Sequence, residues 1–276
     1  MSRWRGLSRL GERLRGRTPG LYLALRRLSR LAGQETLDPT WGRIAAALSP
    51  GELAVQAGPF AGMRYLPFAG GSGLLPKLAG SYEMELHAAV AESIARRPVR
   101  LLNVGAAEGY YAVGYALRVP GLEVHAFDVD VLARQRLGEL ARLNGVAGRI
   151  RRRGECSHRQ LEDLIVARTL IVCDCEGCED RLLDARLAPR LAKADLLVEL
   201  HVEGRPALAA ALRSRFAPTH STTLVTMAGR DAVEAAFAGV LSRVAPEDRG
   251  LATYERDAPT EWLWLRSDAW PGSGGR

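Results

Sequence analysis

The segment that most constrains the fold of this chain is an apolar run that ends in a glycine-containing turn and leads into a helix-like pattern. It covers residues 101–111, with the sequence LLNVGAAEGYY. A strand, a tight loop and a helix N-terminus in this order are typical of an α/β sheet that binds a nucleotide-like ligand at the loop. A second strand is predicted at 122–127 and is followed by Asp128, 23 residues after Gly105. A carboxylate there can accept hydrogen bonds from a ribose diol, so the two features predict a ribose-bearing cofactor.

The composition of the loop indicates which cofactor this is. A dinucleotide-binding loop needs a middle glycine so that the backbone can approach a pyrophosphate, but here the loop carries Ala107 and Glu108. A carboxylate at a helix N-terminus repels phosphate. S-adenosylmethionine (SAM) has no phosphate and carries a sulfonium cation, so the sequence favours SAM over NAD. The residues expected to bind it are Asn103, Gly105, Ala106, Gly109, Tyr110, Asp128 and Asp174.

Strand-like and helix-like patterns alternate after residue 98, which predicts parallel βαβ units with helices on both faces of the sheet. The fold class expected is therefore α/β, with a Rossmann-like sheet that is mostly parallel and has an antiparallel last strand. The strands are predicted at 99–104, 122–127, 148–153, 169–174 and 194–200, with a terminal antiparallel pair at 221–227 and 261–265. The helices are predicted near 109–118, 130–143, 158–167, 178–187 and 205–215.

Four regions are expected along the chain. Residues 1–40 form a basic amphipathic arm with leucines at helical spacing, an N-terminal helical extension. Residues 41–97 form a hairpin, loops and a helix capped by Ser81. Residues 98–268 form the SAM-binding domain, and residues 269–276 form a disordered tail.

The positive charge of the chain is concentrated in the arm. The formal net charge is +7, yet residues 1–30 alone carry +8, with nine arginines against Glu12, which leaves −1 on the remainder. The catalytic region is therefore nearly neutral, and nucleic acid is not expected as a partner. An arm of this kind, residues 1–31, can lie on an anionic membrane surface, or it can pack on the core or remain solvated. The chain has no apolar run that approaches a membrane span, and we expect a cytoplasmic protein.

Polar side chains follow two further strands. Asp174 comes directly after a fully apolar strand, where it can hold a substrate hydroxyl, act as a base or bind a metal, or can cap the next helix. Glu199 and His201 lie on one side of the following strand. We expect His201, Asp174 and Glu199 to be the catalytic residues, with Glu199 orienting His201.

At this point the chain resembles a known family. The segments 103–111, 126–128 and 174–179, with the sequences NVGAAEGYY, AFD and DCEGCE, look like the FkbM-type class I SAM-dependent methyltransferases, whose motifs are D-x-G-A-N-x-G-x-Y, A-F-E-P and D-V-E-G-A/x-E. The resemblance covers roughly residues 80–265 and implies O-methylation of a hydroxyl on a sugar, polyketide or other metabolite. Asn103 and Glu108 depart from it, as do Cys175 and Cys178. Some sugar O-methyltransferases bind Mg²⁺ with acids at these strand ends, which Asp174, Glu176 and Glu199 can imitate.

The four cysteines lie between residues 156 and 178. Cys175 and Cys178 form a C-x-x-C pair, a pattern that occurs in zinc sites and in redox-active sites, but the chain has no second such pair. We therefore expect no thiolate metal site, and reduced thiols.

The sequence as a whole predicts a SAM-dependent O-methyltransferase that acts on a small molecule, sugar or glycan. Two alternatives stay open. One is an NAD(P)-dependent oxidoreductase on a similar sheet. The other is a membrane-associated SAM-fold binding module without turnover.

Overall fold

The computed structural model describes residues 39–70, 72–201, 207–256 and 260–270. Helix α3 (Pro39–Leu48) spans the junction of two compact units, residues 1–43 and 44–276, and the fold below is that of the second unit. Most of the expected arm and most of the expected tail lie outside the described residues. Within the described part of the chain, no helix is long and apolar enough to cross a membrane.

A seven-stranded sheet forms the centre of the second unit, with the strand order β3-β2-β1-β4-β5-β7-β6. Its first five strands pair in parallel, and β7 runs antiparallel to both of its neighbours. The strands are β1 (Arg100–Val104), β2 (Glu123–Phe127), β3 (Ile150–Arg153), β4 (Thr169–Cys173), β5 (Ala194–Leu200), β6 (His220–Thr226) and β7 (Glu261–Ser267). The predicted Rossmann-like α/β sheet is confirmed, and each observed strand lies within about two residues of its predicted position.

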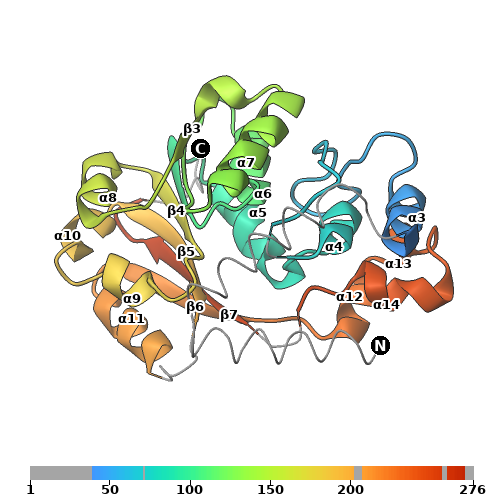
Figure 1. Cartoon of the computed structure of the whole chain (residues 1–276). Coiled ribbons are helices and arrows are strands. Elements are labelled where there is room, and N and C mark those ends of the chain that lie inside the picture. The colour runs from blue at the N-terminus through green and yellow to red at the C-terminus, as the bar shows by residue number, and fades with distance from the viewer. Residues whose placement is uncertain (1–38, 71, 202–206, 257–259, 271–276) are drawn as a thin grey trace, which may run out of the picture. The chain divides into compact units, whose positions relative to one another are not determined.

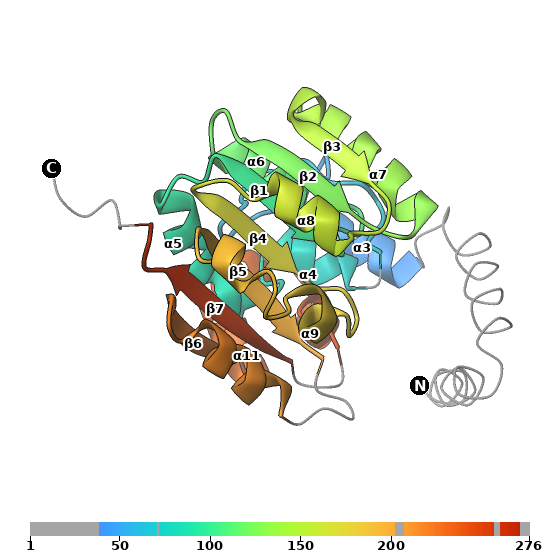
Figure 2. The same cartoon turned by 90° about the vertical axis from the view of Figure 1, so that its left-hand side faces the viewer.

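Helices cover both faces of this sheet (Figures 1 and 2). One face carries α5 (His87–Ala95), α6 (Tyr110–Arg118) and α7 (Val131–Leu143). The other carries α8 (His158–Leu164), α9 (Glu179–Leu182), α10 (Ala188–Leu191) and α11 (Leu208–Phe216). Because both faces are covered, every residue of β4 and β5 is buried, which is the pattern of a central parallel strand.

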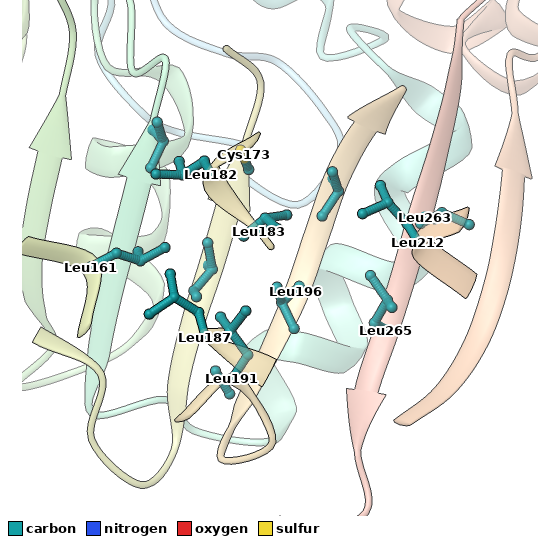
Figure 3. Close-up of a cluster of buried hydrophobic side chains, with 14 of the residues drawn as sticks. Leu161, Cys173, Leu182, Leu183, Leu187, Leu191, Leu196, Leu212, Leu263 and Leu265 are labelled. Carbon is teal, nitrogen blue, oxygen red and sulfur yellow. The ribbon is translucent and has the colours of Figure 1, made fainter. Parts of the chain in front are cut away.

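The core on the α8–α11 face is rich in leucine (Figure 3). Leu196 of β5 and Leu265 of β7 face leucines such as Leu191 and Leu212 from the covering helices. Burying a leucine side chain stabilises a fold by about 1.5–3 kcal/mol, so this layer holds the central strands together and fixes their carboxyl ends. Those ends carry the polar residues of the candidate site.

Two helices begin or end differently from the prediction. The helix expected at 178–187 is much shorter, since α9 ends at Leu182 and α10 begins at Ala188, beyond the expected range. Asp184 accepts a hydrogen bond from the backbone N–H of Arg186 (2.9 Å), a local turn that competes with the helix. The helix expected to start at Ser81 starts at His87, after a 3-10 turn, η1 (Met84–Leu86). Ser81 instead belongs to the exit from α4, where its backbone N–H bonds to the carbonyl of Pro76.

The segments on either side of the main βα units contain short elements. Residues 50–80 form an isolated antiparallel bridge between Ala54 and Arg64 and helix α4 (Leu74–Ala79), which the sequence did not predict. The other short elements are η2 (Ala147–Arg149), α12 (Arg230–Ala236), α13 (Ala238–Leu241), η3 (Pro246–Asp248) and α14 (Arg249–Ala252). Helices α4 and α14 are in contact, so segments far apart in sequence lie side by side there.

Candidate functional site

The loop between β1 and α6 uses its own backbone N–H groups to hold its shape. The N–H groups of four residues bond within the protein: Gly105 and Ala106 to the carbonyl of Phe127 (both 2.9 Å), Ala107 to Oδ2 of Asp128 (2.8 Å) and Gly109 to the carbonyl of Ala106 (2.8 Å). A pyrophosphate needs free N–H groups at this position. Since these four are engaged, the loop suits a cofactor that carries no phosphate there.

Asp128 and Asn103 supply acceptors beside this loop. Asp128 follows β2, and its second oxygen accepts a hydrogen bond from the N–H of Asp130 (2.8 Å). A carboxylate oxygen has two lone pairs, so Asp128 retains capacity for a ribose hydroxyl. Burial raises the pKa of Asp128. Asn103 is buried in β1, and its Oδ1 has no hydrogen-bond partner among the described residues. An unpaired buried acceptor is costly, so Asn103 fits a ligand that brings a donor, as SAM does.

Three further residues expected to bind the cofactor, Ala106, Gly109 and Tyr110, can offer only backbone atoms to a ligand. Gly109 has a φ of 100° and comes directly before α6, where a Cβ would lie 2.8 Å from Leu137. The side chain of Tyr110 packs in an aromatic cluster, with ring centroids 5.3 Å from Phe60 and 5.1 Å from Tyr82. Only the backbone of Tyr110 therefore remains for a cofactor. Ala106 is buried in the loop itself.

The prediction that Glu108 presents a repelling charge to the cofactor site is wrong. Glu108 is fully buried and forms an ion pair with Lys77 of α4. It also accepts hydrogen bonds from the hydroxyl of Tyr65 (2.5 Å) and the N–H of Gly70 (2.8 Å). Burial acts to raise the pKa of Glu108, but Lys77 outweighs it and the pKa is lowered. Lys77 neutralises this carboxylate from 31 residues earlier in the chain, a distance at which local sequence patterns carry no information.

The structure brings together His201, Asp174 and Glu199 at the carboxyl ends of β4 and β5. Nε2 of His201 lies 3.7 Å from a carboxylate oxygen of Asp174 and 3.7 Å from one of Glu199. Glu176, on the loop after Asp174, lies 3.6 Å from the same nitrogen. Burial, and then the charge of Glu199, raise the pKa of Asp174 well above its ordinary value.

Glu179, and not Glu199, is the direct hydrogen-bond partner of His201. Its Oε1 lies 2.7 Å from Nδ1 of His201 and also accepts the N–H of Gly177 (3.1 Å). Glu179 is buried at the start of α9, and it was not among the residues expected to be catalytic. Burial acts to lower the pKa of His201, but the hydrogen bond with Glu179 and the charge of Glu199 outweigh it, and the pKa is raised.

Glu199 is held instead by Arg256, a residue that the sequence analysis did not single out. Arg256 bonds to Glu199 (2.5 Å) and to Glu83 (2.8 Å), so one guanidinium joins two buried carboxylates. Tyr111 donates a further hydrogen bond to Glu83. Burial, and then the charge of Glu199, raise the pKa of Glu83 to about 7. Glu83 and Arg256 are 173 residues apart, and no motif marks either of them.

The cluster of His201, Asp174, Glu176 and Glu199 is in direct contact with the loop between β1 and α6. The N–H of Asp174 bonds to the carbonyl of Val104 (2.9 Å), and a Cβ at Gly105 would overlap the carbonyl oxygen of Asp174. Gly105, with a φ of 77°, is therefore required both by its conformation and by this close approach. A ligand on the loop lies next to the cluster.

The expectation of reduced thiols is wrong for one pair, because Cys175 and Cys178 form a disulfide. Glu176 and Gly177 between them both have a positive φ, which folds the loop back so that the two cysteines meet. Cys156 and Cys173 are free. Among the described residues, the group that could hold a metal ion is Asp174, Glu176 and His201, whose ligand atoms lie within 4.8 Å of one another. It contains no thiolate, and Glu199 is not part of it.

No protein-family model and no curated protein matches this chain. Solved structures that are similar to it include the O-methyltransferase TomG from Streptomyces achromogenes in complex with SAM (12% identity, TM-score 0.46, 85% of this chain and 93% of that chain). They also include a putative O-methyltransferase from Klebsiella pneumoniae (14%, 0.43, 88% and 96%) and a putative precorrin-6Y C5,15-methyltransferase domain from Corynebacterium diphtheriae (15%, 0.43, 68% and 98%). Similarity at this level does not assign a reaction or a substrate.

Proposed function

We propose that this chain is a SAM-dependent methyltransferase of the FkbM type that methylates a hydroxyl of a small molecule, sugar or glycan. The observation that carries the proposal is the contact between the Gly105 loop and the cluster of Asp174 and His201. A cofactor bound on the loop has its reactive end beside a histidine and several carboxylates, which is what transfer to a hydroxyl requires.

The residues beside the loop suit SAM in three ways. Four N–H groups of the loop are already paired within the protein, which makes the loop less suited to a pyrophosphate and argues against the alternative of an NAD(P)-dependent oxidoreductase. Asp128 retains acceptors for the ribose hydroxyls, and Asn103 has an unpaired acceptor for a donor of the cofactor. The carboxylates of Asp174, Glu176 and Glu199 are electrostatically favourable for a cation. SAM, when bound, supplies an electrophilic methyl group on a sulfonium.

His201 has the position and the partners of a general base. Its Nδ1 faces Glu179, which fixes the ring and stabilises its protonated form, and its Nε2 faces the open side of the cluster between Asp174 and Glu176. Removal of a hydroxyl proton by Nε2 leaves an imidazolium that Glu179 stabilises. Glu179 acts through His201 and is a positioning residue.

A metal-assisted version of the reaction is a second candidate, favoured by the ligand set of Asp174, Glu176 and His201. Two carboxylates and one imidazole suit Mn²⁺ better than Mg²⁺, which prefers oxygen ligands and retains its waters. In this version His201 binds the ion and cannot serve as the base. A requirement for added metal, rather than the loss of activity in a His201 variant, therefore separates the two versions.

The cofactor assignment is tested by calorimetry with S-adenosylhomocysteine and its 2′-deoxy analogue. If Asp128 binds the ribose, loss of a hydrogen bond to a charged group, about 1.5–3 kcal/mol, makes the analogue bind the native protein at least tenfold more weakly. In Asp128→Asn this difference should shrink. The analogue leaves the protein unchanged, which separates ribose binding from the bonds of Asp128 to the loop. Equal affinity for both ligands would remove Asp128 from the cofactor site.

The reaction is tested by following the methyl group of isotopically labelled SAM into an extract of small molecules and glycans by mass spectrometry. His201→Ala should lower turnover by roughly 10²–10⁴-fold with SAM affinity unchanged if His201 is the base. If a metal is required, EDTA should abolish turnover and Mn²⁺ should restore it. SAM binding without any labelled product would support the binding module without turnover.

A further inference from the structure

The disulfide Cys175–Cys178 closes the loop that carries the acidic side of the site. Asp174 comes immediately before the bridge, Glu176 lies inside it, and Glu179 comes immediately after it. Both bridged cysteines are partly exposed, so an external thiol can reach them. The bridge is thus the one part of this loop whose covalent state can change.

The bridge touches the carboxylate that holds His201. Sγ of Cys175 lies 3.6 Å from Oε1 of Glu179, the same oxygen that bonds to Nδ1 of His201. A sulfur in a disulfide carries no proton, whereas a thiol is a weak donor. Reduction therefore places a new donor beside this oxygen, where it competes with His201.

The bridge also holds a backbone conformation that the open chain resists. Glu176 has a φ of 57°, in the left-handed region that is unfavourable for a residue with a Cβ. Such a conformation persists when the surrounding structure imposes it, and here the bridge closes a turn of only two intervening residues. On the other side, the N–H nitrogen of Cys175 packs against Gly105, 3.5 Å from where a Cβ would lie, so a change in this turn reaches the cofactor loop.

The two free cysteines do not replace the external thiol. Sγ of Cys173 lies 3.8 Å from Sγ of Cys175, but Cys173 is buried at the end of β4 among leucine side chains (Figure 3). Burial raises the pKa of Cys173 well above its ordinary value and raises that of Cys156 to about 12. Both remain protonated near neutral pH, and the thiolate is the attacking species in exchange.

We propose that Cys175–Cys178 is a redox-active disulfide that an external dithiol reduces, and that its reduction loosens the hold of Glu179 on His201. The dithiol gives two electrons and two protons: its sulfurs become a disulfide, the Cys175–Cys178 bond breaks, and both cysteines become thiols. The site would then have a bridged state with His201 fixed and a reduced state with His201 released. The inference concerns the loop itself and does not require that the site transfers methyl groups.

The exchange is tested by counting thiols in the full-length native protein. The protein is treated with dithiothreitol, alkylated with iodoacetamide while folded, and mapped by mass spectrometry. Cys175 and Cys178 should be alkylated only after reduction, and removal of the reductant under mild oxidation should restore the bridge. A bridge that resists reduction until the protein is denatured, or cysteines that are free before reduction and do not pair on oxidation, would overturn the proposal.

The link to His201 is tested by NMR of protein with ¹³C-labelled histidine, at constant pH. Reduction should move the ring signal of His201 and leave that of His220, on the far end of β6, in place. Cys175→Ser/Cys178→Ser should keep the His201 signal at the reduced position with or without dithiothreitol. Cys156→Ser, which retains the bridge, should respond as the native protein does. A His201 signal that is unchanged on complete reduction of the native protein would overturn the link, whether or not the double variant folds.

Discussion

At the scale of single residues, the orientation and the raised pKa of His201 depend on a partner from a neighbouring element, Glu179 of α9. Strand alternation puts Glu199 on the same side of β5 as His201, and on that ground Glu199 was expected to orient the ring. In the structure Glu199 is paired with Arg256, and Nδ1 of His201 is hydrogen-bonded to Glu179. A residue that strand alternation places beside a histidine can therefore orient it only if it does not form a stronger ion pair with another residue.

Glu179→Gln tests this assignment, because it removes the charge and keeps the shape. Glu179 raises the pKa of His201, so the substitution should lower that pKa, as followed by NMR titration of the labelled histidines. If His201 is the base, the increase in methyl transfer with pH should move to lower pH as well. Glu139→Gln, at an exposed ion pair with Arg136, is the control and should change neither. An unaltered pKa of His201 in Glu179→Gln would contradict the assignment.

At the scale of elements, a buried ion pair between Lys77 and Glu108 joins α4 to the loop that precedes α6. Lys77 and Glu108 are both fully buried, and Glu108 also accepts from Tyr65 and Gly70. The loop between β1 and α6, which we propose binds the cofactor, therefore packs against the segment that precedes the main βα units. Breaking such a pair on one side leaves a buried charge without compensation.

Lys77→Met should accordingly lower the free energy of unfolding by about 3–5 kcal/mol, measured by urea denaturation. Adding Glu108→Gln removes the stranded charge. Its amide oxygen can accept from the N–H of Gly70 and its amide nitrogen can donate to the hydroxyl of Tyr65, so Lys77→Met/Glu108→Gln should recover much of the loss. A Lys77→Met protein as stable as the native one would show that the pair does not stabilise the fold.

The same elements show what the sequence could and could not predict. The strands, their order of appearance and the positions of Asp174, Glu199 and His201 follow from local apolar patterns, because a central strand is buried on both faces. Helix α4 is short, and it is stabilised by distant contacts rather than by periodicity. The pairs of Lys77 with Glu108 and of Arg256 with Glu83 join segments 31 and 173 residues apart, and such pairing follows from the packed fold alone.

At the scale of the whole molecule, buried acids give the fold an unusual dependence on pH. Burial raises the pKa of Glu83 to about 7 and that of Glu255 to about 8, from 4.5, and it also raises the pKa of Asp174. Between pH 4.5 and 8 the folded protein retains protons that the unfolded chain has released. The raised pKa of His201 acts in the same direction, since its stabilising charge is lost as the pH rises through that value.

The free energy of unfolding should therefore fall as the pH rises from about 6.5 to about 8. Groups with lowered pKa values do not offset this decline. Acids such as Glu123, at about 2, lose their contribution only below about pH 4.5, and His87, His125 and His220, whose pKa values burial lowers from 6.5, lose theirs only below about pH 6.5. Urea denaturation at intervals of one pH unit measures it. Glu255→Gln removes the group with the higher of the two printed pKa values and should flatten the decline between pH 6 and 8, whereas Glu139→Gln should leave it unchanged. Stability that increases from pH 6.5 to pH 8 would show that these acids are ionised in the folded protein without cost, with Arg256 compensating them fully.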